Sequence, residues 1–420
     1  MTFTLPSPSF CVLPWVHAAT LTDGSVQLCC VADGASPINL NDSTLGDYWN
    51  SSYLRGIRRS MLEGKPVKEC WKCHQEESNS YRSHRVVENG VWERKLTPET
   101  LVELIGSTEA DGYLQAGVQS VDLRLGNTCN LQCVMCQPRD SSKWLGLAKK
   151  LSEGFSNPDL RSEYEYKSLI DTSLFEWYRN DAFWEDLTEF LGDLKEIIIA
   201  GGEPMLIKEH FAFIRAVCES GHAEHIHLRY HTNGTIFPEE MVAYWGQFKV
   251  VEFFISLDGI GEIAEYVRYP SKWAEIEANI RRFDQLGDNV ILKLLFSAHA
   301  LNTYYLPEFL TWARTAGLSK MTKFSQIQQF VHPGIVHWPL NQNLKVLPLE
   351  LKRVITDRIE AHLSQYSAES VTKYTAILQH MNSEDQSERF PQLIEYTRGL
   401  DAARGTDLSK TFPELVEYWA

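Results

Sequence analysis

Three cysteines crowd into the segment GNTCNLQCVMCQP, residues 126–138, as Cys129, Cys133 and Cys136 with the spacing C-x3-C-x2-C. Three thiolates on one short loop can each bind one iron of a four-iron cluster. A structural zinc site would close with a fourth cysteine or histidine, and none follows at close spacing. The loop therefore indicates a cluster whose fourth iron is left for an external ligand.

A second group of cysteines lies near the N-terminus, and it contains Cys11, Cys29, Cys30, Cys70 and Cys73. Eight of the nine cysteines thus fall into two groups. The start of the chain, MTFTLPSPSF, has no basic segment before an apolar stretch, so we expect no signal peptide and a cytoplasmic protein. Clustered thiols in the reducing cytosol favour metal or redox chemistry over disulfides. Because C-x2-C is also half of a common zinc pattern, zinc and iron–sulfur both remain open for this group.

Composition excludes other classes. The net charge of −15 and the pI near 5.4 disfavour a protein that binds the phosphate backbone of nucleic acid mainly by electrostatic attraction. There is no run of eighteen apolar residues, so no membrane-spanning helix is expected. At 420 residues the chain predicts two or three packed units.

From about residue 119, short apolar strands alternate with amphipathic helices, which predicts an α/β fold: a partial (β/α)6 TIM-like barrel built on a parallel sheet. Trp273, Ile276, Ile280 and Phe283 mark one helix, with Gly287 as its stop. Nearly 60 residues separate Cys136 from the second strand, which predicts two inserted helices that cover the barrel or form a lid. The predicted strands are 120–125, 195–200, 224–231, 249–256, 290–297 and 322–328.

The predicted organisation has four parts. A small cysteine-rich N-terminal domain is followed by a linker, the barrel with its helical insertion, and a C-terminal helical segment. The boundaries are 1–95, 96–118, 119–340 with the insertion at 137–194, and 341–420.

Polar residues alternate with apolar ones on several strands, so we expect the polar set to face the barrel lumen. His225, His227, Arg229 and His231 form one such row, and Asp122, Arg124 and Lys293 add charges on other strands. These charges fit either a catalytic site or a buried structural ion network. Lys293, His227 and His231 are the candidates for catalysis, whereas His225 with His227 lacks a third ligand for a metal.

The cysteine loop and two later motifs resemble the radical SAM superfamily. AGGEP, residues 200–204, ends the second predicted strand, and SLDG, residues 256–259, ends the fourth. In the family the first motif binds the methionine amine of S-adenosylmethionine, which implies that role for Gly201, Gly202 and Glu203. The resemblance also implies that Ser256 meets the ribose and that Arg268 reaches the carboxylate.

Two further residues complete the pocket that the resemblance implies. Asn233 lies in HTNGT at the end of the third predicted strand. Met135 precedes the third cysteine, where the family often has an aromatic residue beside the adenine, and a methionine can fill the same space.

The N-terminal segment resembles the twitch or SPASM auxiliary-cluster domains of radical SAM enzymes, here placed before the barrel. In those domains a glycine allows a hairpin turn that brings distant cysteines together, a role that falls to Gly24. The resemblance implies one auxiliary [4Fe–4S] cluster held by Cys11, Cys29, Cys70 and Cys73, with Cys30 as the alternative to Cys29.

The resemblance implies an oxidoreductase-type enzyme. Its barrel [4Fe–4S] cluster, reduced by an external donor such as flavodoxin or ferredoxin, would cleave S-adenosylmethionine to a 5′-deoxyadenosyl radical that takes a hydrogen from the substrate. Twitch and SPASM relatives act on peptides, proteins or small molecules. We expect a peptide or protein substrate that is oxidised, cross-linked or epimerised, with electron transfer through the auxiliary cluster. The alternative substrate is a carbohydrate- or nucleotide-like metabolite. The alternative function is that of a protein without catalytic activity, a module that binds an iron–sulfur cluster or zinc.

Overall fold

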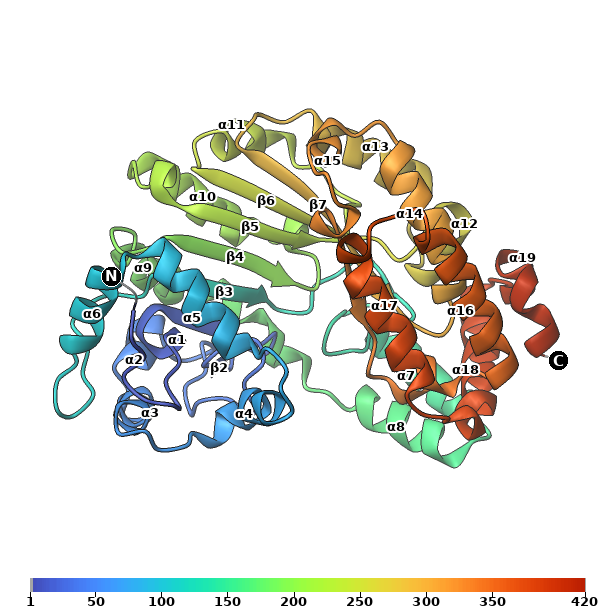
Figure 1. Ribbon diagram of the computed structural model, residues 1–420, viewed down its shortest axis with the longest axis horizontal. Coiled ribbons are helices and arrows are strands. Elements are labelled where there is room, and N and C mark those ends of the chain that lie inside the picture. Colours follow the sequence, from blue (N-terminus) through green and yellow to red (C-terminus); the bar gives the residue numbers. More distant parts are fainter. Residues whose placement is uncertain (1–2, 420) are drawn as a thin grey trace. The chain divides into compact units, whose positions relative to one another are not determined.

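The computed structural model describes residues 3–419, and Figure 1 shows its ribbon. The fold is mixed α/β, with one eight-stranded sheet in the order β2-β1-β3-β4-β5-β6-β7-β8. The chain divides into two compact units. Unit 1 comprises 1–126, 172–229 and 243–251, and unit 2 comprises 127–171, 230–242 and 252–420.

Unit 1 holds the N-terminal helices and the first strands. Its strands are β1 (His17–Thr20), β2 (Val26–Gln27), β3 (Ser120–Leu125) and β4 (Glu196–Gly201). Its helices are α1 (Leu13–Val16), α2 (Leu45–Trp49), α3 (Ser52–Leu62), α4 (Trp71–Ser78), α5 (His84–Lys95), α6 (Pro98–Gly106), α9 (Asp181–Glu189) and α10 (Lys208–Glu219), with the 3-10 helices η1 (Lys68–Cys70), η2 (Thr172–Arg179), η3 (Pro204–Leu206) and η4 (Ala223–His225).

Three elements cross the boundary between the units, and the remaining ones belong to unit 2. The crossing elements are β5 (His227–Thr232), α11 (Val242–Trp245) and β6 (Val250–Ser256). Unit 2 contributes β7 (Val290–Ala298), β8 (Val331–Ile335), α7 (Trp144–Gly154), α8 (Pro158–Ser168), α12 (Gly261–Val267), α13 (Trp273–Asp284), α14 (Leu306–Thr315), α15 (Ser319–Thr322), the 3-10 helix η7 (Ile327–Gln329), α16 (Leu349–Leu363), α17 (Ala368–Asn382), α18 (Phe390–Arg404) and α19 (Leu408–Thr411).

Five of the six predicted strands are present within a few residues of their expected bounds. The longest, β7, alternates buried and half-buried side chains along its whole length, as a strand does when one face packs on helices. Between β3 and β4 the pairing is parallel, with Ser120 opposite Glu196 and Leu125 opposite Gly201. The predicted α/β class, with a six-stranded partial barrel and a helical C-terminus, is confirmed.

The prediction of a strand at 322–328 is wrong, because this stretch contains the end of α15, a bend and the start of η7. The sixth barrel strand is β8, which pairs in parallel with β7 so that Leu295 lies opposite His332. Its sequence, VHPGI, includes Pro333 and Gly334, both of which are disfavoured in strands. A proline is tolerated here because β8 is the last strand in the sheet order.

The sheet also extends beyond the predicted barrel on the side of the N-terminal segment. Strand β1 pairs in parallel with β3 and antiparallel with β2, which adds a hairpin to the sheet. Gly24 lies in the turn of this hairpin with a φ of +82°, a left-handed conformation that glycine adopts at little cost. The hairpin that the family resemblance implied at Gly24 is therefore present.

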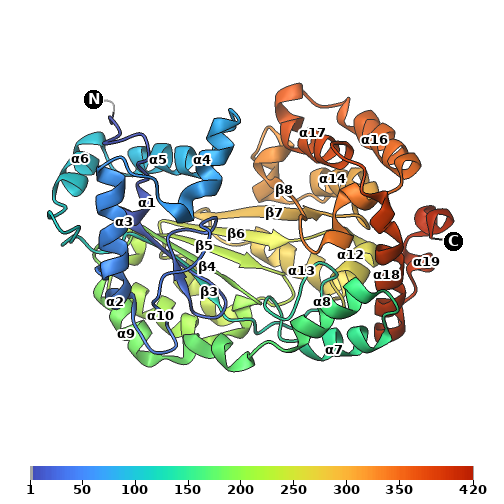
Figure 2. The same ribbon diagram turned by 90° about the horizontal axis from the view of Figure 1, so that it is seen from below.

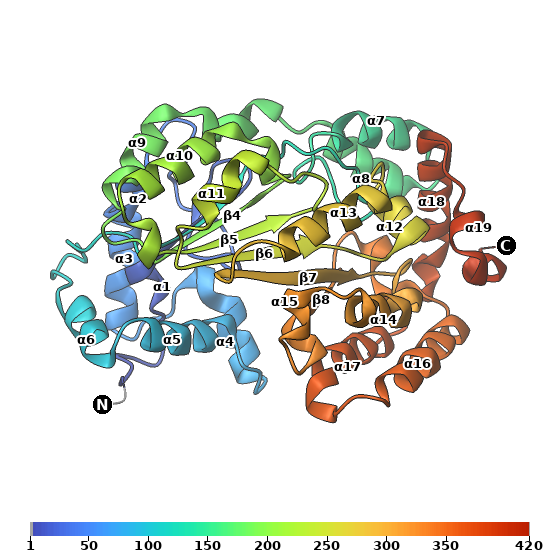
Figure 3. The same ribbon diagram turned by 90° about the horizontal axis from the view of Figure 1, so that it is seen from above.

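The long insertion after the cysteine loop contains more helix than predicted, with α7, α8 and α9 together with η2. Helices α7 and α8 pack against each other, and α7 also contacts α18, as Figure 2 shows. Helix α9 instead contacts α2 and α10 within unit 1. The C-terminal helices of unit 2 pack in pairs, with α16 beside both α17 and α14 (Figure 3).

No helix within residues 3–419 is both long enough and apolar enough to span a bilayer. The predicted strand at 224–231 begins later than expected, since His225 ends η4 and its side chain is 68% exposed. From His227 onward the predicted alternation holds, with half-buried polar residues between buried Leu228 and Tyr230.

Candidate functional site

The cysteine loop leaves the end of β3 and enters unit 2. Cys129 and Cys133 are buried, and Cys136 is partly exposed. The loop backbone pairs with the end of α12 and the residues after it, because Gln132 N donates to the carbonyl oxygen of Tyr269 at 2.6 Å and Val134 N donates to that of Val267 at 2.8 Å. These bonds fix the loop from which the three thiols project.

Side chains from distant helices hold the carbonyl groups of the same loop. Trp144 of α7 donates from Nε1 to the Cys133 oxygen at 3.0 Å. From α18, the Tyr396 hydroxyl donates to the Val134 oxygen and Arg404 donates to the Gln132 oxygen. The sequence offered no signal for Tyr396 and Arg404, since both lie more than 260 residues beyond the groups they bind.

Two polar side chains approach the sulfur atoms. Arg268 Nη1 lies 3.8 Å from Cys133 Sγ, and Asn233 Nδ2 lies 4.0 Å from Cys129 Sγ. A hydrogen bond from Cys136 is the main cause that lowers the pKa of Cys133, and the Arg268 guanidinium adds to it against the effect of burial. The same hydrogen bond, together with burial, raises the pKa of Cys136. Unit 2 thus brings Asn233 and Arg268, two residues predicted for the cofactor pocket, next to the thiols.

Arg268 also forms an ion pair that the sequence did not predict. Its Nη2 lies 2.6 Å from Asp258 Oδ2, and the Asp258 side chain is fully buried. Burial raises the pKa of Asp258, while Arg268 and a 2.7 Å hydrogen bond from Ser297 N act to lower it. Asp258 is the aspartate of the SLDG motif. The sequence identified this motif but gave no indication that its carboxylate pairs with Arg268. Ser256, two residues earlier, ends β6 and is half-buried.

Asn233 and Met135 both lie beside the cysteine loop. Asn233 Nδ2 donates to Asn130 Oδ1 at 2.9 Å, and Asn130 in turn donates to Thr235 Oγ1 at 2.8 Å. Met135 packs, partly buried, against the cluster formed by Cys129, Leu131 and Cys133. Asn130 is a further residue of the site that sequence reasoning missed, although it directly follows a cysteine.

The GGEP motif ends β4 within unit 1. Gly201 has a φ of +129°, and a Cβ atom there would lie 2.8 Å from the backbone nitrogen and oxygen of Leu125. Gly202 N donates to the Gly126 oxygen at 3.1 Å. Glu203 is fully buried, and its carboxylate accepts a hydrogen bond from Met205 N at 3.0 Å. The glycine permits the close approach of β3 and β4 where both strands end.

Four N-terminal cysteines line one cavity of unit 1, and they are Cys11, Cys29, Cys70 and Cys73. They come from the segment before α1, the segment after β2, the end of η1 and the first turn of α4. Burial is the main cause that raises the pKa of Cys11, and it raises the pKa of Cys29 and of Cys70 to about 12. The set chosen from the sequence is therefore gathered in one place.

Cys30 is separate from this cavity. Its thiol is exposed and lies 3.8 Å from His84 Nε2, whereas Cys29 is 9% exposed and lines the cavity. This difference favours Cys29 over Cys30 as the ligand.

The charged residues expected in the lumen form local ion pairs in both units. In unit 1 Arg124 lies 3.9 Å from Asp122, and Arg229 lies 3.4 Å from Glu196. In unit 2 Lys293 pairs with Glu252, a partner that the sequence did not suggest. The half-buried His231 ring stacks on Phe254 with the ring centroids 4.9 Å apart.

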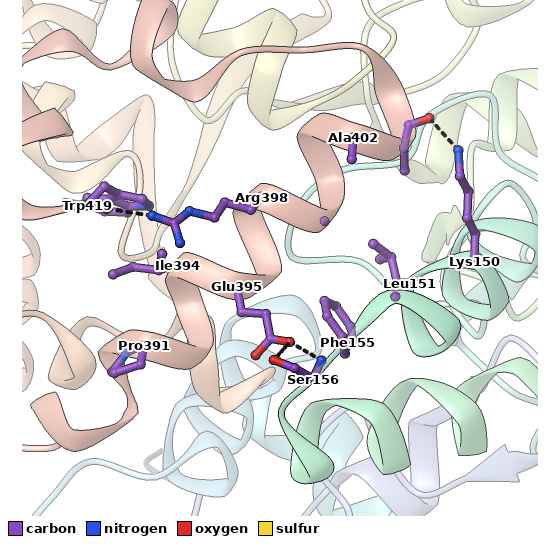
Figure 4. A pocket seen from close by; sticks show the side chains of 13 residues that line it. Lys150, Leu151, Phe155, Ser156, Pro391, Ile394, Glu395, Arg398, Ala402 and Trp419 are labelled. Carbon is purple, nitrogen blue, oxygen red and sulfur yellow. Dashed lines mark hydrogen bonds between the residues drawn. The ribbon is translucent and has the colours of Figure 1, made fainter.

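One cavity of unit 2 lies apart from these residues, between α7 and α18. Its volume is about 720 Å³. Figure 4 shows Glu395 directed toward Ser156, Arg398 toward Trp419, and Lys150 toward the backbone of α18. None of the predicted site residues lines it, so the cavity is not where the thiol chemistry is concentrated.

Both thiol groups have the donor set that iron–sulfur clusters require. Among the described residues no three Cys, His, Asp or Glu side chains are grouped as ligands of a single metal ion. In a four-iron cluster each thiolate binds its own iron, so the thiolates need not meet at one point. The two loops fit such clusters in the number and kind of their ligands.

Comparison with protein-family models agrees with the arrangement. Residues 123–296 match the radical SAM superfamily model, and residues 11–74 match the SPASM iron–sulfur cluster-binding domain model. Among curated proteins the comparison finds no match.

Solved structures of low identity were also found. Native anSMEcpe with bound AdoMet is 16% identical with a TM-score of 0.32, and the match covers 58% of this chain and 60% of that one. Streptococcus suis SuiB is 12% identical with a TM-score of 0.36, over 81% of this chain and 70% of that one. TYW1 with a lysine–pyruvate adduct is 12% identical with a TM-score of 0.29, over 58% and 72%. The chain spans less than two thirds of the length of anSMEcpe.

The two matched domains indicate [4Fe–4S] clusters as cofactors together with S-adenosylmethionine. With the barrel strands, the three-cysteine loop and the four-cysteine N-terminal segment in these positions, the chain is a radical SAM protein of the twitch/SPASM type.

Proposed function

We propose that this protein is an enzyme that cleaves S-adenosylmethionine reductively and modifies a peptide or protein by radical chemistry. The observation that carries the proposal is the loop with Cys129, Cys133 and Cys136, which offers three thiols to a four-iron cluster and leaves one iron for the cofactor. Bound there, cluster and cofactor would supply a 5′-deoxyadenosyl radical that abstracts a hydrogen atom from the substrate.

The chain's own residues would have three tasks at this loop. Arg268 and Asn233 donate toward the sulfur atoms, which favours their charged form. The donors from α7 and α18 hold the loop carbonyls and so keep the thiols oriented. Burial of Cys129 and Cys133 limits the access of water and oxygen to the reacting atoms.

For the cofactor itself, we assign Gly201, Gly202 and Glu203 to the methionine amine and Ser256 to the ribose. Arg268 keeps its proposed role toward the carboxylate of S-adenosylmethionine. Its guanidinium is already shared between Asp258 and Cys133, so this role requires the remaining N–H groups of the same side chain.

The four N-terminal cysteines would hold an auxiliary [4Fe–4S] cluster. Their complete set of thiols supports a role in electron transfer, because a cluster with four protein ligands has no iron free for substrate. An external one-electron donor, such as flavodoxin or ferredoxin, would reduce the barrel cluster. The peptide substrate is proposed from the combination of the radical SAM and SPASM domains.

An anaerobic assay tests the proposal. Protein reconstituted with iron and sulfide should form 5′-deoxyadenosine from S-adenosylmethionine after reduction with dithionite, measured by mass spectrometry. A candidate peptide should then show a change in mass that depends on S-adenosylmethionine. Protein that contains zinc with little iron, or that forms no 5′-deoxyadenosine when both clusters are present, contradicts the proposal.

A further inference from the structure

Six residues of unit 2, from four neighbouring strands and one helix, form a cluster that we call the lumen cluster. Its residues are His231 of β5, Glu252 and Phe254 of β6, Lys293 of β7, His332 of β8, and Lys373 of α17. Only His231 and Lys293 were candidates from the sequence. The other four are joined to them by the folding of the chain.

Phe254 is the centre of the lumen cluster. His231 stacks on its ring at 4.9 Å with an interplanar angle of 4°, and His332 meets the ring edge-on at 5.5 Å. The ammonium group of Lys293 lies 5.1 Å from the ring centroid. The cluster therefore has an aromatic platform with a cation beside it.

The charges of the lumen cluster do not balance. Lys293 is paired with Glu252. Lys373 lies 3.3 Å from His332 Nδ1, and it forms no ion pair within the described part of the chain. The ammonium group of Lys373 thus has no carboxylate partner in the described part of the chain, whereas that of Lys293 is paired with Glu252.

His332 is held in one tautomer. Its Nε2 lies 3.2 Å from the carbonyl oxygen of Gln329, which can only accept, so the proton is on Nε2. Nδ1 then accepts from Lys373. Burial and the two nearby lysines lower the pKa of His332 to about 4, so the ring is neutral at pH 7 and does not repel Lys373.

The position of the lumen cluster relates it to the cysteine loop. Phe254 precedes Ser256 by two residues on β6, and His231 lies on β5 two residues before Asn233, which follows the end of that strand. Side chains two apart along a strand share a face and are separated by roughly 7 Å. Phe254 is thus one layer below Ser256, and its stacking partner His231 is two residues before Asn233, which contacts Cys129.

We propose that Lys373 and His332, with the Phe254 platform, form a binding site for a carboxylate group of the substrate. The inference rests on the proposed function, because the layer above is the one assigned to the cofactor. A peptide can present a carboxylate from an acidic side chain or from its own C-terminus. Lys373 would form the charge-assisted hydrogen bond, and Lys293 and Glu252 would fix the platform.

Saturation-transfer NMR with three small probes tests this site in the full-length protein. The probes are N-acetylaspartic α-amide, which has a side-chain carboxylate; N-acetylalanine, which has a terminal carboxylate; and N-acetylalaninamide, which has none. At least one acid should bind more tightly than the neutral amide, and the preferred acid identifies the source of the carboxylate. Loss of one charge-assisted bond in Lys373→Gln should weaken its binding roughly 10-fold.

Matched variants complete the experiment. Lys373→Arg keeps the charge and should retain binding, and Lys149→Gln, at an exposed lysine of α7, should leave it unchanged. The proposal is overturned if the neutral amide binds as well as both acids, or if Lys373→Gln binds the acids like the unmodified protein. Formation of 5′-deoxyadenosine is measured separately, so its absence refutes the proposed function and not the carboxylate site.

Discussion

The two cysteine sites differ in what surrounds their sulfur atoms. In the loop after β3, polar groups of Arg268 and Asn233 approach the thiols. In the N-terminal cavity, burial dominates, and it raises the pKa of Cys29 and Cys70 to about 12. In the first group the Arg268 guanidinium favours the thiolate of Cys133, although the Cys133 hydrogen bond and burial raise the pKa of Cys136. The two groups therefore differ in the polar side chains that the fold places beside their sulfur atoms.

The largest effect is expected from removing the three-cysteine site. Replacing Cys129, Cys133 and Cys136 with Ala should lower the iron content by about half and bring 5′-deoxyadenosine below detection, because one of two four-iron clusters loses all its protein ligands. Iron analysis and mass spectrometry measure the two effects. Cys218→Ala, at a buried cysteine of α10 outside both groups, is the control and should keep both.

Removing half of the four-cysteine site should have a different outcome. The double replacement of Cys70 and Cys73 with Ala should also lower the iron content by about half, since the other four-iron cluster is lost. It should spare cleavage of S-adenosylmethionine but reduce modification of the substrate. If cleavage stops here as completely as in the triple variant, the two sites do not have separate roles.

The buried ion pair of Asp258 and Arg268 beside the cysteine loop should contribute more to the free energy of unfolding than an exposed pair does. Asp258→Asn leaves Arg268 charged and unpaired in the interior, which should cost about 3–5 kcal/mol in the free energy of unfolding. The exposed pair of Glu176 and Arg179 is the matched control, and Glu176→Gln should cost about 0–1 kcal/mol. Urea denaturation measures both. Equal costs would mean that the Asp258 pair does not support the cysteine loop.

A smaller effect is expected where β3 and β4 end. Gly201→Ala should destabilise the protein by about 1–3 kcal/mol, because the new Cβ meets the Leu125 backbone at 2.8 Å in a left-handed conformation. It should also raise the KM for S-adenosylmethionine. Gly146 of α7 has open space around it, so Gly146→Ala should stabilise by about 0.5–1 kcal/mol and leave KM unchanged.

The last prediction concerns the dependence of stability on pH. Burial lowers the pKa of His299 to about 3, and Asn302 accepts its backbone N–H at 2.9 Å while donating to the Asp258 oxygen. The unfolded state binds the proton more readily, so stability is present above about pH 6.5 and declines toward pH 3, by up to about 1.4 kcal/mol per pH unit.

Replacing this histidine should flatten that decline. Unfolding of His299→Gln, measured by urea denaturation between pH 7 and pH 4, should depend less steeply on pH than that of the unmodified protein. His225→Gln, at an exposed histidine, should not change the slope. An unchanged slope in His299→Gln would show that its burial does not contribute to the acid sensitivity.

Much of the fold could be predicted because its signals are local. The bounds of β3 were predicted to the residue, and α13 was predicted from its apolar spacing and a following glycine. The last strand was misplaced because VHPGI contains a proline and a glycine, while the preceding TKFSQIQ alternates as a strand would. The position of the last strand is instead determined by its pairing with β7 at the edge of the sheet, where a proline is tolerated.

Some residues of the candidate site also have a local sequence signal, and others have none. Cys129, Cys133 and Cys136 are recognisable from spacing, and the glycine motif is recognisable from its place at a strand end. Asp258 as the partner of Arg268, and Lys373 as the partner of His332, carry no comparable signal. Their separation along the chain, 41 residues in the second case, is unrelated to their distance in space.

The amino-acid sequence by itself determined the number and spacing of the thiols, the alternation of the strands and the turn at Gly24, because these depend on neighbours along the chain. Only the tertiary structure decided which groups surround the sulfur atoms. Arg404 and Tyr396 reach the cysteine loop from α18, more than 260 residues away. Such contacts depend on how whole helices pack, and packing is a property of the assembled core rather than of any short segment.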